Sequence, residues 1–191
     1  MRLFVAIALP QEVKDIIATL RGGIPDARWI AAENFHITLA FIGDVQPPDM
    51  LDISSALGKL AHPAFHLDIE DAGVFGSNKR PRILWAGVRN LETLTLLHQK
   101  IVTAIESIGI KIEDRRFRPH ITLARVHKSP YEKVRNYLTD HALFKTKPVA
   151  VNSFSLFSSH LASSGAIYNE EVIFDLDPVD AAVSAQTSLG S

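Results

Sequence analysis

Residues 36–40 read His-Ile-Thr-Leu-Ala, and residues 120–124 read the same five letters. In each copy polar and apolar residues alternate, which is typical of a β-strand with one buried face. The alternation puts histidine and threonine together on one face, and isoleucine and leucine on the other. A strand that needs only a solvated face has no reason to select the same two polar residues twice, so we interpret both copies as functional.

The patterns on either side of the two copies predict alternating strands and helices. An apolar run over Leu3 to Leu9 predicts a strand, and i, i+3, i+4, i+7 spacing over residues 11–21 predicts a helix. A second helix should follow Pro47, with Leu51, Leu57 and Leu60 on its apolar side. The other expected strands are 35–42, 65–69, 83–88, 117–126, 149–158 and 166–176, and the other expected helices are 91–108 and 131–138.

Both halves of the chain repeat the order strand, helix, His-Ile-Thr strand, helix, strand. We interpret residues 1–177 as a single bilobal domain with pseudo-repeats at 1–76 and 82–177, and residues 178–191 as a disordered tail. Hairpin signals and the mixed order of elements favour an α+β fold over a doubly wound parallel sheet.

The composition limits the classes of partner. The chain has 191 residues, 47% of them hydrophobic, and a net charge of −1, so only a local basic cluster could attract an anionic substrate. It has no cysteine, which excludes disulfides, zinc-thiolate sites and a cysteine nucleophile. No apolar stretch is long enough to cross a bilayer, and we therefore expect a cytoplasmic protein with no membrane partner.

Two histidines suit displacement at a phosphorus atom between them. Because an unperturbed imidazole titrates near pH 6.5, one ring can be neutral while the other is protonated. The neutral ring can take a proton from the attacking water, and the imidazolium can give one to the leaving oxygen. Thr38 and Thr122 lie two residues after His36 and His120, where their hydroxyl groups can donate to phosphoryl oxygens.

A metal site is the main chemical alternative for paired histidines. Zinc or two-metal phosphoesterases need carboxylates or further histidines beside the first ones. Neither motif has Asp or Glu at the i+2 position. Glu33 and Asp44 flank the first strand, but only Asp114 lies near the second. We therefore expect no metal and no other cofactor.

Other residues near the motifs have two interpretations each. By simple alternation Arg125 lies opposite His120, and a bulge or a strand end would be needed to bring it to the same face. Phe41 and Trp85 are expected in the core, unless exposure lets either stack on a base. Two basic clusters could be solvated loops or could bind an RNA backbone: Lys79, Arg80 and Arg82, and Arg115, Arg116 and Arg118.

The six other histidines have no repeated context, so structural or surface roles are the default for His62, His66, His98, His127, His141 and His160.

The paired His-x-Thr motifs resemble those of the 2H phosphoesterase superfamily, and most closely its RNA 2′,3′-cyclic phosphodiesterase family, also described as 2′–5′ RNA ligases. Residues 35–43 resemble the first family signature and residues 117–125 the second. Residues 2–7 and 81–87 are also similar to the family, and the resemblance covers about residues 1–177. As a pair the motifs are highly specific.

The resemblance implies two pseudo-symmetric α+β lobes whose antiparallel sheets face a central cleft, with helices outside. It implies hydrolysis of a terminal 2′,3′-cyclic phosphate to a 2′-phosphate without a metal. His36 would donate the proton to the leaving 3′ oxygen, and His120 would accept the proton of the attacking water. Thr38, Thr122 and Arg125 would bind the phosphate, while Phe41 would stack on the base, at odds with its position by alternation.

The expected partners are therefore RNA ends or nucleotides that carry a 2′,3′-cyclic phosphate, bound by a monomer. In reverse, the same geometry could join a 5′-hydroxyl end to the cyclic phosphate. Two alternatives stay open at this point: a small substrate such as an ADP-ribose cyclic phosphate, and a non-catalytic module that binds RNA ends.

Overall fold

The computed structural model describes residues 1–77, 80–113, 116–162 and 165–178. Its helices are α1 (Gln11–Ala18), α2 (Pro47–Leu57), α3 (Leu91–Ser107) and α4 (Tyr131–Asp140), with a 3₁₀ turn, η1, at Ala32–Asn34. Its strands are β1 (Arg2–Ala8), β2 (Arg28–Trp29), β3 (His36–Asp44), β4 (Phe65–Leu67), β5 (Ile69–Ser77), β6 (Arg80–Val88), β7 (His120–Arg125), β8 (Val149–Val151), β9 (Ser153–Ala162) and β10 (Gly165–Asp175). The predicted α+β class is confirmed.

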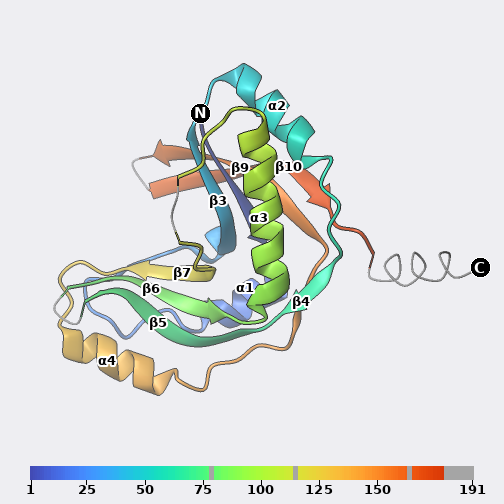
Figure 1. The fold of residues 1–191 in the computed structure, drawn as a ribbon. Helices are drawn as coiled ribbons and strands as arrows, with labels where there is room; N and C mark the ends of the chain where they lie inside the picture. The colour runs from blue at the N-terminus through green and yellow to red at the C-terminus, as the bar shows by residue number, and fades with distance from the viewer. Residues whose placement is uncertain (78–79, 114–115, 163–164, 179–191) are drawn as a thin grey trace, which may run out of the picture.

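Most strands form one antiparallel sheet with the order β10-β9-β1-β3-β7-β6-β5, and β2 pairs with β7. The two halves of this sheet meet between β3 and β7, where Ile37 pairs with Ile121. The two strands run in different directions on the ribbon, so the halves diverge from this pair (Figure 1). The two predicted sheets are thus joined at the centre of the two motifs.

The last strands of each half of the chain lie in the other half of the sheet. β5 pairs with β6, although β5 belongs to residues 1–76 and β6 to residues 82–177. In the same way β9, from the second half of the chain, pairs with β1. If the two segments are repeats, as the sequence predicts, they exchange strands. The short strands β4 and β8 form a separate antiparallel pair.

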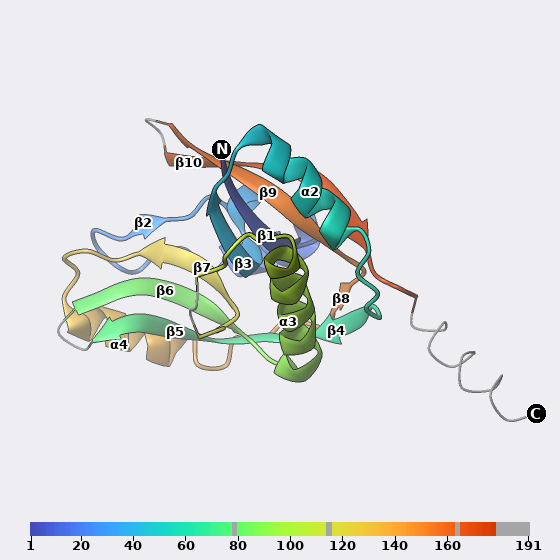
Figure 2. The same ribbon diagram turned by 45° about the horizontal axis from the view of Figure 1, so that its top comes forward.

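Helices cover the outside of the sheet, as expected. α2 lies above β9 and β10, and α4 lies below β5 and β6, in both views (Figures 1 and 2). α2 begins at Pro47, where the missing N–H costs no hydrogen bond, and Asp49 accepts a hydrogen bond from the Gln46 N–H. The prediction that Leu51 packs inward is wrong: it is 74% exposed, because the helix turns Ile53 and Leu57 to the core instead.

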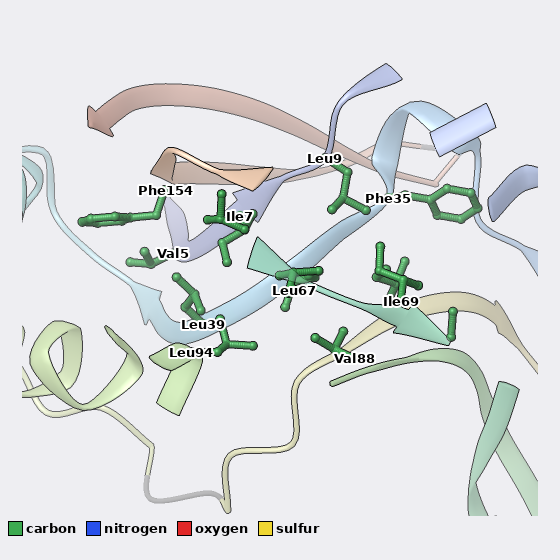
Figure 3. Close-up of a cluster of buried hydrophobic side chains, with 14 of the residues drawn as sticks. Val5, Ile7, Leu9, Phe35, Leu39, Leu67, Ile69, Val88, Leu94 and Phe154 are labelled. Carbon is green, nitrogen blue, oxygen red and sulfur yellow. The ribbon is translucent and has the colours of Figure 1, made fainter. Parts of the chain in front are cut away.

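A single hydrophobic core connects the two halves. Val5, Leu39 and Leu67 of residues 1–76 lie near Val88 and Leu94 of residues 82–177 in one cluster (Figure 3). Because the exchanged strands contribute to it from both sides, neither half of the sheet has a separate core.

Strand β5 was predicted only at its first residue, since Gly73, Gly76 and the left-handed Asp71 break the hydrophobic pattern that follows Ile69. Of the predicted tail, 178–191, all but Pro178 lies outside the described residues. Within the described chain, no helix combines the length and hydropathy needed to span a membrane.

Candidate active site

The motif strands β3 and β7 carry the same irregularity at the same place. On β3, Val5 pairs with Ala40 and Ala6 pairs with Thr38, so Leu39 is an extra, bulged residue. On β7, Leu84 pairs with Ala124 and Trp85 with Thr122, which makes Leu123 the bulged residue. A bulge shifts the alternation of the strand by one residue.

This shift moves Phe41 and Arg125 to the face that carries the histidines. Both strands have two consecutive buried residues at the bulge, followed by an exposed residue. The prediction that Phe41 belongs to the core is wrong, since its side chain is 55% exposed. The bulge that the sequence required for Arg125 is present. We call the sheet surface that carries the histidines, the threonines, Phe41 and Arg125 the histidine face.

Each bulge exposes a backbone carbonyl that a distant segment satisfies. The Leu39 carbonyl accepts a hydrogen bond from Nδ1 of His98 on α3, at 2.8 Å. The Leu123 carbonyl accepts one from the backbone N–H of Ile30, next to β2, at 2.9 Å. Because an unpaired buried carbonyl is costly, these two donors stabilise the bulges.

The register between the two motif strands brings the four polar side chains together. Ile37 of β3 pairs with Ile121 of β7. Because the two strands are antiparallel, the neighbouring positions set His36 toward Thr122 and Thr38 toward His120. All four side chains are partly exposed, whereas the isoleucines between them are fully buried. The arrangement thus surrounds one position with two imidazoles and two hydroxyls.

Both imidazoles are held in the same way. Nδ1 of His36 donates to the carbonyl of Asn34, and Nδ1 of His120 donates to the carbonyl of Arg118, each at 2.7 Å. A carbonyl can only accept, so Nδ1 carries the hydrogen in either charge state. Nε2 is therefore the nitrogen that gains or loses a proton in both rings.

Aromatic side chains surround the histidines unequally. His36 contacts Phe4, Tyr168 and Phe157, with ring centroids at 5.1, 5.3 and 6.3 Å. His120 contacts Phe75 edge-on at 4.8 Å. Tyr168 lies on β10, which has no counterpart in the other half of the sheet, so His36 is the more enclosed of the two rings.

Burial lowers the pKa of both histidines below the usual 6.5. For His36 the hydrogen bond to Asn34 opposes this shift, while the positive charges of His120 and Lys14 add to it. For His120 the hydrogen bond to Arg118 opposes the effect of burial. Both rings thus favour the neutral form when no anion is bound.

The surroundings include polar groups that the sequence did not single out. A hollow beside His36 is lined by Lys14, Asn34, Tyr168 and Glu170, among others. Arg28 on β2 pairs directly with Arg125, and directly paired residues share a face. Two arginines at paired positions at one end of β7 give this end a local positive charge that favours a bound anion. Only the pairing of β2 with β7 reveals this role of Arg28.

The predicted basic clusters are only partly described. Lys79 and Arg115 lie outside the described residues. Arg80 and Arg82 are exposed and line a second hollow with His127, close to the end of β7. Arg116 and Arg118 are also exposed. Within the described residues, no three His, Asp or Glu side chains gather as a metal site would require.

Comparison with known proteins agrees with this geometry. The family described as LigT like Phosphoesterase matches residues 7–85 and 88–168. The RNA 2′,3′-cyclic phosphodiesterase of Thermotoga maritima is 34% identical over 176 residues, which cover 88% of this chain and 91% of that protein. The enzyme of the same name from Archaeoglobus fulgidus is 29% identical, over 92% of this chain and 100% of its own length.

A solved structure, Escherichia coli LigT complexed with 3′-AMP, aligns with a TM-score of 0.72 at 30% identity, over 92% of this chain and 97% of LigT. The family match covers both halves of the sheet and both histidine motifs. This chain therefore belongs to the LigT-like phosphoesterases of the 2H phosphoesterase superfamily.

Proposed function

We propose that this protein is an RNA 2′,3′-cyclic phosphodiesterase that hydrolyses a terminal cyclic phosphate to a 2′-phosphate without a metal. The observation that carries the proposal is the pair of imidazoles, each bonded through Nδ1 to a backbone carbonyl, on two strands whose register sets each histidine toward the threonine of the other motif. The names of the relatives from T. maritima and A. fulgidus support the substrate.

The reaction proceeds by in-line displacement. Nε2 of His120 takes a proton from water as the water oxygen bonds to phosphorus. The bond from phosphorus to the ribose 3′ oxygen breaks, and Nε2 of His36 gives that oxygen a proton. Thr38, Thr122 and Arg125 donate to the phosphoryl oxygens as charge develops on them. Phe41, exposed on the same face, stacks on the terminal base.

The negative charge of the substrate affects the protonation of His36 in this mechanism. His36 must be protonated to act as the acid, yet burial favours its neutral form in the free protein. A bound phosphodiester brings a negative charge next to the ring, which raises the pKa of His36. Substrate binding is therefore coupled to proton uptake by the acid.

The direct test is product analysis on an RNA oligonucleotide that ends in a 2′,3′-cyclic phosphate. In excess EDTA we expect full turnover, with a 2′-phosphate and no 3′-phosphate as the product. Failure to form the product, or complete loss of turnover on chelation, would contradict the proposal. Affinity for the RNA end without turnover would identify a binding module instead.

The two histidines provide the second test. Replacement of either His36 or His120 by Ala should lower kcat by about 10²–10⁴-fold, the usual contribution of a general acid or base. Both side chains are partly exposed and outside the core, so melting temperatures should change little. His66→Ala is the matched control, because His66 is exposed on β4, and its kcat should equal that of the wild type.

Substrate length separates RNA ends from small nucleotides. If RNA is the substrate, the exposed Arg80, Arg82, Arg116 and Arg118 contact its backbone, and kcat/KM for an oligonucleotide exceeds that for a cyclic mononucleotide. A preference for an ADP-ribose cyclic phosphate would instead favour the small substrate. We also propose that the protein acts as a cytoplasmic monomer, which light scattering can check for the oligomeric state.

A further inference from the structure

Trp85 lies on the histidine face beside the second motif. It pairs with Thr122 across β6 and β7, and Gly87, two residues on, pairs with His120. Its neighbours Leu84 and Ala86 point to the core and are fully buried, whereas Trp85 is partly exposed. The expectation of a core tryptophan is therefore wrong. Directly paired residues share a face, so the indole starts beside the threonine that we assign to phosphate binding.

Two glycines leave room for the indole to lie flat against the sheet. A Cβ atom at Gly73 would lie 2.1 Å from Cζ2 of Trp85, so no other residue fits there without moving the ring. A Cβ atom at Gly87 would lie 3.3 Å from Cζ3. The six-membered ring thus lies over the backbone of β5 and β6, where both strands lack side chains.

The contacts of the indole are apolar. Phe75 packs against it at 5.4 Å between ring centroids and contacts His120 edge-on at 4.8 Å. The indole N–H has no hydrogen-bond partner among the described residues. In the other half of the sheet, the residue that pairs with Thr38 is Ala6, which cannot form such a surface. The pair of Trp85 and Phe75, which we call the indole platform, therefore lies on the His120 side, whereas the rings on the other side, Phe4, Phe157 and Tyr168, pack against His36 itself.

The strand order relates this platform to the reaction. Across the sheet run β3 with His36, β7 with His120, and then β6 and β5 with Trp85 and Phe75. In an in-line displacement the leaving oxygen and the nucleophile occupy opposite sides of the phosphorus. The ribose of the cyclic phosphate lies on the His36 side, so any group attached to the nucleophile extends from His120 toward Trp85.

We propose that Trp85 and Phe75 form a stacking subsite for a second nucleoside, one that carries a 5′-hydroxyl group. This inference rests on the proposed function. The 5′-hydroxyl replaces water: His120 takes its proton, the 5′ oxygen bonds to phosphorus, the bond to the 3′ oxygen breaks, and His36 protonates that oxygen. The product is a 2′–5′ phosphodiester with a free 3′-hydroxyl. In the reverse direction the same nucleoside leaves with a proton from His120.

Fluorescence can test the subsite directly. The chain has two tryptophans, and Trp29→Phe leaves Trp85 as the only one. With 2′-AMP present at saturation to fill the His36 side, we expect adenosine to quench Trp85 emission saturably. No quenching, or quenching that 2′-AMP competes away, would overturn the proposal. Hydrolysis of 2′,3′-cyclic AMP by the same preparation tests the proposed function separately, so the two failures can be distinguished.

Kinetics provide a second test of the subsite. The two rates to compare are cleavage of a 2′–5′-linked adenosine dinucleotide and hydrolysis of 2′,3′-cyclic AMP. Trp85→Leu should lower the ratio of the two rates by about tenfold or more, and Trp85→Phe should recover most of it. Phe41→Leu is the matched control, because loss of the first stacking residue should lower both rates together. An equal loss of both reactions in Trp85→Leu, or no cleavage of the dinucleotide by the wild type, would overturn the proposal.

Discussion

The two motif histidines are oriented by hydrogen bonds to the main chain. Each ring is fixed by a carbonyl two residues earlier, just outside its strand: Asn34 in one case and Arg118 in the other. A main-chain acceptor has no charge to gain or lose, so it selects the tautomer at every pH. What differs between the rings is their enclosure, because Tyr168 and Lys14 are near His36 alone.

This environment leads to a prediction for the pH dependence. In the proposed mechanism the free protein is active when His120 is neutral and His36 is protonated, and burial lowers the pKa of both rings below 6.5. The maximum of kcat/KM should therefore lie on the acid side of about pH 6.5. In the complex the phosphate raises the pKa of His36, so the basic limb of kcat should lie at higher pH than that of kcat/KM.

The measurement is a pair of pH profiles on 2′,3′-cyclic AMP, one for kcat/KM and one for kcat. The two apparent pKa values belong to the coupled pair of histidines and not to either ring alone. A basic limb of kcat/KM above about pH 7 would show that the free protein already keeps its acid protonated, contrary to the effect of burial.

At the scale of the elements, the bulges in β3 and β7 decide which side chains reach the histidine face. His98 of α3 bonds to the bulged Leu39 and stacks on Phe117 at 4.0 Å, with the rings 3° from parallel. Phe117 precedes Arg118, whose carbonyl holds His120. The His98 side chain thus contacts the bulge of β3 and the segment just before β7, and we infer that it is a positioning residue.

Replacement of His98 by Ala should therefore impair both stability and catalysis. The Leu39 carbonyl would lose its donor, at a cost of about 1–3 kcal/mol in the free energy of unfolding, and kcat/KM should fall. The matched control is His141→Ala, since His141 also bonds to a carbonyl and stacks on a ring, both of Tyr137, but at the end of α4. Urea unfolding and kcat/KM should show that His141→Ala loses stability only; equal kinetic losses in both variants would contradict the positioning role.

The bulges also mark where prediction from the sequence ends. Hydrophobic periodicity located the helices and the motif strands, because those patterns are local, although it misplaced Leu51 on α2. The carbonyls of the two bulged residues bond to His98 and Ile30, which are distant from them in sequence. The local pattern therefore gives no sign of the bulges, and simple alternation placed Phe41 on the wrong face. Arg28 was missed, and Trp85 was expected in the core with base stacking as the alternative, because the positions of both depend on which strand pairs with β7.

At the scale of the whole molecule, the C-terminal end of the described chain is pinned to the start of β4. The Ala64 N–H donates to the Asp177 carbonyl, and the Asp177 N–H donates to the His62 carbonyl. These hydrogen bonds join the segment after β10 to the segment before β4 and β5, so the exchanged strands of the two halves are linked next to each other. His62 itself is only 3% exposed.

The buried His62 makes the stability of the fold sensitive to acid. Burial lowers the pKa of His62 and the charge of Lys100 adds to this, while the charge of Asp177 and a hydrogen bond to the backbone of Thr93 oppose it. The native state then binds fewer protons than the unfolded chain, whose histidines titrate near pH 6.5. Stability from this residue is complete above about pH 6.5 and decreases as the pH falls toward the lowered value, by at most about 1.4 kcal/mol per pH unit.

Replacement of His62 by Leu should reduce this acid sensitivity, because leucine suits the apolar contact with Phe65 and cannot bind a proton. The measurement is the melting temperature of wild type and variant at an acidic and at a mildly basic pH. We expect the variant to lose less stability on acidification than the wild type, while the exposed His66→Leu behaves like the wild type. Since His36 and His120 also have lowered pKa values, part of the acid sensitivity should persist in His62→Leu. An identical pH dependence in His62→Leu and wild type would mean that protonation of the buried ring does not contribute to the acid sensitivity.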